Sequence, residues 1–317
     1  MLKEKALNVT NRTTTVMQPL NVRVPEKIIE RLDAISKRNG ISRSEIIRSS
    51  LIVYLNLLEN LGEFVSLRDL KLFPRDIRSE RFRDTSILHL KDLCVVISST
   101  SSGAIGSKDE DIIKIDEREL GRIMARCAII KIISLGAHPA LLVSNLSVEY
   151  HPMGARIFEG IFLEAKRAGV KDIVEGHTEE NFKTQQTALS IVGVGITDEK
   201  NLKFGVSRRG DLIFVLGDPK VGYEVVGSEM IGIEDVKRVR KLHYVHDIIP
   251  VGRRGIKHQL YEFRGQFGHK IELNDDIGID IEKSAGPSTS ILISLDKRYT
   301  EDFQRKIKRG ELIGKIL

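Results

Sequence analysis

Few residues in this sequence have types and spacings that suggest a chemistry, and those few are basic. The segment SGAIGSK places Lys108 at the end of a glycine-rich stretch, a composition that can bring backbone amides and an ammonium group to a phosphate. The same stretch is equally typical of an ordinary turn. Paired arginines occur in SRRGD and GRRG, but an arginine- and glycine-rich turn is usually only solvated. The sequence alone assigns no catalytic residue.

The composition sets limits on the class of protein. A chain of 317 residues predicts two or three domains, and no apolar run approaches the roughly 18 residues of a membrane span. The N-terminus lacks the apolar stretch of a secretion signal, so we expect a cytoplasmic protein with no membrane partner. Cys94 and Cys127 lie in apolar runs, which predicts buried thiols and neither a disulfide nor a metal site. The net charge of +6 is compatible with a polyanionic partner.

A strand and two helices are predicted near the N-terminus. LNVRVPEKI, residues 20–28, alternates apolar and polar side chains and runs through Pro25 into an amphipathic helix that ends before Gly40. SRSE then reads as a capping box in which the Ser42 hydroxyl accepts from the Glu45 amide, and a second apolar helix follows. Because so short a unit cannot bury two apolar stripes alone, we expect it to dimerise by pairing strand with strand.

The segment LNVRVPEKIIERLDAISKRNGISRSEIIRSSLIVYL resembles the ribbon-helix-helix (CopG/Arc-like) family of DNA-binding domains. The resemblance implies a two-chain ribbon that enters the major groove of double-stranded DNA at a palindromic operator. It makes Asn21 and Arg23 the base-contacting residues, and these side-chain types suit adenine and guanine. It places Ser42, Arg43 and Ser44 at a DNA phosphate. The same pattern also fits a pure dimerisation module or one that pairs with a toxin-like partner.

The rest of the chain is predicted to be an α+β body joined to this head. Residues 61–90 are basic and irregular, which predicts a linker after a head domain of residues 18–60. Beyond it we expect strands at LCVVIS, ALLVSNLSVEY, TALSIVGVGI and DLIFVLG, and helices at residues 117–135 and 154–169. This order of elements predicts an α+β layer architecture.

Several phrases of the body resemble the superfamily of aminoimidazole ribonucleotide synthetase (PurM-like), thiamine-monophosphate kinase, selenophosphate synthetase and the hydrogenase maturation factor of that fold. The phrases are SSGAIGSK, IIKIISLGAHP, AKRAGVKDIVEGHT and RRGDLIFVLG, followed in order by VHDII, KIEL, KSAGPSTSILISL and GELIGKIL. The resemblance implies a synthetase-like N-terminal domain at 91–217 and a shortened C-terminal domain at 218–317. It also implies that the body forms dimers.

The chain departs from this superfamily where the enzymes hold magnesium. Their two carboxylate positions, on the helix before the Gly-Ala turn and in the Gly-Gly-acid-Thr loop, are Lys131 and His177 here. Lysine cannot ligate Mg²⁺, and phosphoryl transfer without the metal loses its charge neutralisation, so the parent chemistry is disfavoured and no metal is expected. Substitute ligands remain an alternative: Asp109, Asp111 and Asp116 precede Lys131 in the sequence, and Glu175 lies two residues before His177.

The same departures allow a different use of the body. If the family fold brings Lys108, Lys131 and protonated His177 together, these donors can bind a phosphate directly in place of a metal. Thr178 belongs to the same loop, and Asp247 matches an aspartate of the family. Against this interpretation, His177 can equally be a surface residue and Lys131 can extend from the flank of its helix.

Together these observations predict a DNA-binding transcriptional regulator that forms a homodimer or a higher even oligomer. Its degenerate synthetase-like body is expected to sense a small phosphorylated or nucleotide-like ligand, and no other cofactor is indicated. The alternative is an ATP-dependent enzyme of the same superfamily that regulates its own operon. The sequence leaves open the ligand, the operator and the sign of regulation.

Overall fold

The computed structural model describes residues 22–61, 77–82 and 84–317. The chain divides into two units, residues 1–57 and 58–317, and each is described by itself. We call the first unit the head and the second the body. Within the described residues, no helix is both long enough and apolar enough to cross a membrane.

The head contains the two helices that the sequence predicts. Helix α1 spans Glu26–Asn39 and ends where Gly40 adopts a left-handed conformation (φ 68°) and donates its amide to the Ser36 carbonyl. Helix α2 spans Arg43–Leu61, and the Ser42 hydroxyl accepts from the Glu45 amide at 3.2 Å, which confirms the predicted N-cap. Residues 22–25 have no regular secondary structure in the single chain, while residues 20 and 21 of the predicted strand lie outside the described residues.

The first layer of the body is a six-stranded sheet with the order β1-β2-β3-β8-β6-β7. Neighbouring strands are antiparallel except β6 and β7, which are parallel. The strands are β1 (Ile77–Phe82), β2 (Thr85–Leu90), β3 (Leu93–Gly103), β6 (His138–Leu146), β7 (Asp172–Glu175) and β8 (Ala188–Asp198). The predicted linker at 61–90 is therefore wrong for residues 77–90, which form a hairpin at the edge of this sheet. Five of the six β1 residues are exposed, so the strand carries no apolar alternation from which to predict it.

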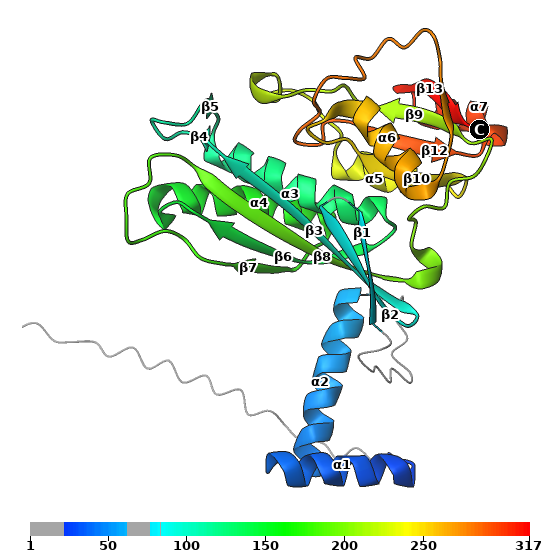
Figure 1. Ribbon diagram of the computed structural model, residues 1–317. Coiled ribbons are helices and arrows are strands. Elements are labelled where there is room, and N and C mark those ends of the chain that lie inside the picture. Colours follow the sequence, from blue (N-terminus) through cyan, green and yellow to red (C-terminus); the bar gives the residue numbers. More distant parts are fainter. Residues whose placement is uncertain (1–21, 62–76, 83) are drawn as a thin grey trace, which may run out of the picture. The chain divides into compact units, whose positions relative to one another are not determined.

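Helices α3 (Glu117–Ser134) and α4 (Ala155–Ala168) cover one face of this sheet (Figure 1). Both match their predicted positions. The two helices cross closely because Gly160 has no side chain: a Cβ there would lie 1.9 Å from the Arg118 carbonyl oxygen. Shorter elements nearby are β4 (Ile105–Gly106), β5 (Ile113–Lys114) and a π-helix at Tyr150–Gly154.

The second layer is a five-stranded antiparallel sheet with the order β10-β12-β9-β13-β11. Its strands are β9 (Leu212–Leu216), β10 (Val245–Pro250), β11 (Ile271–Leu273), β12 (Ile291–Leu295) and β13 (Gly310–Ile316). Its helices are α5 (Ile233–Arg240), α6 (Gly255–Phe267) and α7 (Thr300–Lys306), with 3₁₀ turns at Glu199–Asn201, Gly222–Glu224 and Lys297–Tyr299. One hydrophobic cluster joins α3 and α4 to this sheet, and a second cluster joins its other face to α6. This α+β arrangement confirms the predicted fold class.

Candidate functional site

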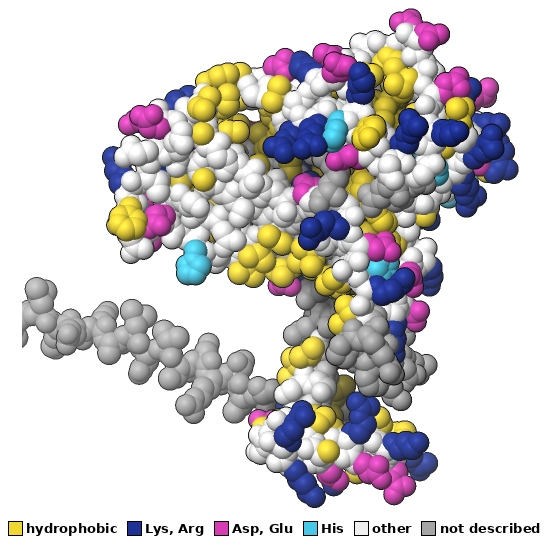
Figure 2. All heavy atoms as spheres, in the orientation of Figure 1, with side chains coloured by type: hydrophobic (Ala, Val, Ile, Leu, Met, Phe, Trp, Pro, Cys, Tyr) yellow, Lys and Arg dark blue, Asp and Glu magenta, His cyan; other side chains and the backbone are white. Residues whose placement is uncertain are grey.

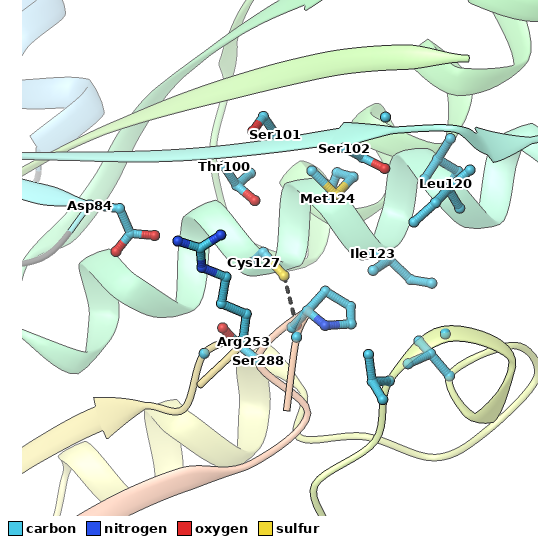
Figure 3. Close-up of a pocket in the computed structure, with 18 of the residues that line it drawn as sticks. Asp84, Thr100, Ser101, Ser102, Leu120, Ile123, Met124, Cys127, Arg253 and Ser288 are labelled. Carbon is cyan, nitrogen blue, oxygen red and sulfur yellow. Dashed lines mark hydrogen bonds between the residues drawn. The ribbon is translucent and has the colours of Figure 1, made fainter. Parts of the chain in front are cut away.

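A cavity of about 1170 Å³ lies in the body between the two layers. Strand β3 and helix α3 form one wall, and segments of the second layer at 221–226, 252–262 and 286–288 form the other. In Figure 3, Thr100 and Ser102 point from β3 toward α3, whereas Ser101 points to the opposite face of the sheet. Thr100 and Ser102 therefore line the cavity from the helix-covered face of the first sheet, whereas Ser101 and its β8 partner Ser190 border it from the other face.

The two ends of the cavity differ in chemistry. Toward the start of α3 it is walled by apolar side chains, among them Ile113, Leu120, Ile123, Met124 and Val225. Toward the end of α3 it is lined by the charged residues Asp84, Lys131 and Arg253. Lys131 and Leu120 are eleven residues apart on α3, which corresponds to about 16 Å at 1.5 Å per residue.

Lys131 and Arg253 are the two cations at the polar end, and their partners differ. The Lys131 ammonium group, with a side chain only 10% exposed, binds the Asp84 carboxylate and donates to the Ser99 carbonyl at 2.6 Å. The Arg253 guanidinium extends toward Asp84 in Figure 3, and it forms no hydrogen bond or ion pair within the described part of the chain. The neighbouring Arg254 is held by His258 at 3.1 Å.

Helix α3 also binds the loop 286–288, which lines the cavity. The buried guanidinium of Arg126 donates to the carbonyls of Ile231 (2.6 Å) and Ser288 (3.1 Å), and it also binds the Pro287 carbonyl. The Cys127 thiol donates to that Pro287 carbonyl at 2.8 Å. The prediction that Cys94 and Cys127 are buried thiols is confirmed. Local sequence patterns gave no signal for Asp84, Arg126 or Ser288, because their contacts join distant segments.

The other predicted ligand residues do not line this cavity. Lys108 is mostly buried and binds the Glu149 carboxylate at 2.6 Å and the Thr184 carbonyl at 2.9 Å, and this ion pair lowers the Glu149 pKa to about 2. His177 is exposed, and the Thr178 hydroxyl donates to Glu180 at 2.9 Å. Asp247 is buried, where it accepts from the backbone amides of residues 205 and 207 at 2.9 and 2.8 Å. Of the five, only Lys131 reaches the cavity.

Of the two positions at which the sequence resemblance would place magnesium ligands, Lys131 does not suit a hard cation. The Lys131 ammonium places a positive charge at the first position, already bound to Asp84. Among the substitute acids, Asp111 accepts from the amides of Thr187 (2.7 Å) and Lys108 (2.9 Å), and Asp116 caps α3 and binds Arg156. Across residues 22–61, 77–82 and 84–317, no group of three His, Cys, Asp or Glu side chains is arranged to hold a metal.

The predicted DNA-contacting residues of the head are accessible where the structure describes them. Arg23 and Ser44 are exposed, whereas Asn21 lies outside the described residues. The Ser42 hydroxyl serves as the N-cap of α2 and is itself exposed, and the exposed Arg43 guanidinium binds Asp33 of α1. Figure 2 shows apolar side chains at the surface of the head. The apolar residues that are exposed in the single chain include Ile28, Ile47, Leu51, Val53 and Leu55.

Comparison with known protein families assigns the head. Residues 18–58 match the family model of ribbon-helix-helix proteins, copG family. The head is a ribbon-helix-helix domain. Its exposed apolar stripes fit a domain of that kind, because a strand and two short helices cannot bury their apolar faces within one chain.

Solved structures define the fold of the body. The hydrogenase maturation protein HypE of E. coli is 14% identical, covers 84% of this chain and 90% of its own, and has a TM-score of 0.55. Thiamine-monophosphate kinase from Stenotrophomonas maltophilia K279a is also 14% identical, with 82% and 92% covered and a TM-score of 0.55. A HypE solved in complex with ATP is 16% identical, with 83% and 86% covered and a TM-score of 0.53.

At these identities the likeness establishes the fold alone, so the body has the synthetase-like fold that the sequence predicts. No match was found among curated proteins.

Proposed function

We propose that this protein is a DNA-binding transcriptional regulator. In this proposal the head binds a palindromic operator as a dimer, and the body binds a small phosphorylated or nucleotide-like molecule in its cavity. The observation that carries the proposal is the ribbon-helix-helix head, whose apolar side chains are left exposed in a single chain. Its DNA target also implies a cytoplasmic location.

The body supports the same dimer. Helices α3 and α4 cover only one face of the six-stranded sheet. On the other face lies a row of half-buried apolar side chains: Val95, Ile97, Val194 and Ile196. A second copy that packs on this face would bury them, and a twofold axis shared by head and body makes a palindromic operator the natural target.

The cavity supports ligand binding by the body. Its volume of about 1170 Å³ is slightly above the roughly 300–1,000 Å³ of most small-molecule sites, and it combines an apolar end with convergent hydroxyl and cationic groups. The Ser102 hydroxyl points into the cavity. It is buried and has no hydrogen-bond partner among the described residues. A ligand that hydrogen-bonds this hydroxyl would remove the cost of leaving it unsatisfied.

The test of DNA recognition uses the full chain and a library of random double-stranded DNA. We expect enrichment of a palindrome and an affinity that falls steeply with salt concentration, because Lys and Arg contacts to phosphate release counterions. Recovery of no preferred sequence at low salt would overturn the regulatory role and leave the head as an assembly module.

The second candidate is an ATP-dependent enzyme that also binds its own operator. Its support is the fold shared with thiamine-monophosphate kinase and with the HypE solved in complex with ATP. Because Lys131 and His177 occupy the carboxylate positions, we expect no release of phosphate from ATP above background, with or without Mg²⁺. Robust Mg²⁺-dependent turnover would establish the second candidate and contradict the sensor.

A further inference from the structure

Asp84 connects the cavity to the hairpin of β1 and β2. Its carboxylate binds Lys131 of α3, and its carbonyl accepts from the amide of Ser99 in β3 at 3.1 Å. Two residues earlier, Phe82 is buried in the hydrophobic cluster of the second layer, with its ring 5.5 Å from that of Phe204. The hairpin turn therefore contacts the cavity, the first sheet and the core of the second layer.

The hairpin depends on these anchors because the other side-chain contacts of β1 lie mostly at the surface, among them the ion pair of Arg78 with Glu199 at 3.2 Å. Among the described residues, the strand pairs with β2 alone, at the edge of the sheet. Five of its six side chains are exposed, so few buried contacts oppose local opening. Strand β1 is also the first described strand after the head in the chain. Release of its turn would therefore act on the part of the body that follows the head in sequence.

The charges at the polar end of the cavity fit a divalent anion. Lys131 and Arg253 contribute two positive charges and Asp84 one negative charge, so these three carry +1 without a ligand. Arg254 and Glu262 also line the cavity and add one charge of each sign, which leaves the sum unchanged. An entering phosphate dianion would be attracted by both cations and repelled by Asp84. If Asp84 leaves, two positive charges face two negative ones, and Thr100 adds a hydroxyl donor at the same place.

We propose that a phosphate monoester binds between Lys131 and Arg253 and displaces Asp84, which releases the β1–β2 hairpin. The apolar part of the ligand lies along Cys127, Met124 and Leu120 toward the other end of the cavity. This inference deepens the proposed function by naming the ligand group that is sensed and the contact that it breaks. Asp84 therefore acts as an internal competitor that an external phosphate replaces.

The experiment uses the full chain with phenyl phosphate as the probe, because it joins a phosphate dianion to a flat apolar group. Inorganic phosphate and benzoate separate the contributions of the phosphate, the apolar group and a carboxylate. Calorimetry measures binding, and hydrogen exchange measures the opening of residues 77–90. We expect phenyl phosphate to bind more tightly than either comparison compound and to speed exchange in the hairpin.

Three variants test which residues control probe binding and hairpin exchange. Asp84→Asn removes the competitor, so hairpin exchange should be fast without any probe and phenyl phosphate should bind about three- to tenfold more tightly. Lys131→Met should lose binding and also show fast hairpin exchange. Asp92→Asn, at the next turn of the same sheet, is the matched control and should behave like the wild type.

The possible outcomes separate the phosphate subsite, the release of Asp84 and the regulatory function. If phenyl phosphate does not bind the wild type, or if Asp84→Asn leaves its affinity unchanged, the phosphate subsite is wrong. If the probe binds but hairpin exchange does not change, the release of Asp84 is wrong while ligand binding stands. If binding and release both occur but the affinity for the selected operator is unaffected, the proposed regulatory function fails and the subsite remains.

Discussion

The head and the body differ in how far a single chain can bury its apolar residues. In α2 of the head, Leu51 is 41% and Val53 is 59% exposed, and α1 contains no buried residue. In α3 and α4 of the body, Ile129 and Ile161 are completely buried. The body therefore has its own hydrophobic core, whereas the head requires a second surface. This difference implies that substitutions in the head act on association and substitutions in the body act on folding.

The largest effect is expected from Leu51→Asp in the head. A twofold dimer that buries both copies of Leu51 loses roughly 1.5–3 kcal/mol for each one, so dimerisation of the head should weaken by at least about 3 kcal/mol. Operator binding should be lost with it. Sedimentation of the full chain and operator titration measure these effects, while thermal unfolding of the body should not change.

The control for this substitution is Ser49→Asp, which introduces the same charge on the opposite side of α2. It should leave the association state intact. If both variants dissociate equally, a general charge effect explains the result, and the apolar stripe is not the interface.

Gly160→Ala tests the prediction that substitutions in the body act on folding. The added methyl group would lie 1.9 Å from the Arg118 carbonyl oxygen, so α3 and α4 must separate, at a cost of about 3 kcal/mol. Denaturant unfolding measures this loss. Gly169→Ala is the matched control, because its Cβ meets no atom within 4 Å and only its left-handed backbone (φ 85°) is strained, which costs about 1 kcal/mol. Equal losses would show that the helix crossing is not tightly packed.

The sequence predicted local features of both regions better than it predicted contacts between distant segments. The cap of α2, the end of α1 at Gly40 and the limits of α3 follow from residues within a few positions of each other. The contacts of Lys131 with Asp84 and of Arg126 with Ser288 join residues 47 and 162 positions apart. No local pattern records such pairs.

The β1–β2 hairpin and the expected phosphate site of Lys108 and Lys131 also could not be predicted correctly from local sequence. Strand β1, with the sequence IRSERF, exposes nearly every side chain as an edge strand does, so its charges indicated a linker. Residue type and family position favour a shared phosphate site for Lys108 and Lys131, but the Glu149 carboxylate neutralises Lys108 away from the cavity. Residue type predicted that both lysines bind anions, whereas only the fold determines which anion each one meets.

Arg23→Ala separates base contact from association within the head. The exposed Arg23 precedes α1 within the residues that match the family model. If its guanidinium contacts a guanine, operator affinity should fall by about 1–3 kcal/mol, with relaxed specificity at one base step. Titration against operators altered one base pair at a time measures this change. An unchanged affinity together with an intact dimer would assign the ribbon to assembly alone.

The smallest effect concerns acid stability of the body. The Lys108 ammonium holds the pKa of Glu149 near 2, below its ordinary value of 4.5. Between these values the unfolded chain binds more protons at this site than the folded chain, so the ion pair stabilises the body above pH 4.5 and progressively less as the pH falls toward 2. Glu149→Gln should therefore cost about 1 kcal/mol at pH 6, since the pair is partly screened by solvent, and less at pH 3.

Urea unfolding of wild type and variant at the two pH values isolates this contribution, because other acid-sensitive groups affect both proteins alike. Glu159→Gln, which removes an exposed ion pair with Arg118 on the same pair of helices, should cost less than about 0.5 kcal/mol at either pH. A loss for Glu149→Gln that is the same at pH 6 and pH 3 would mean that Glu149 acts through its hydrogen bonds to Thr184 and not through its charge.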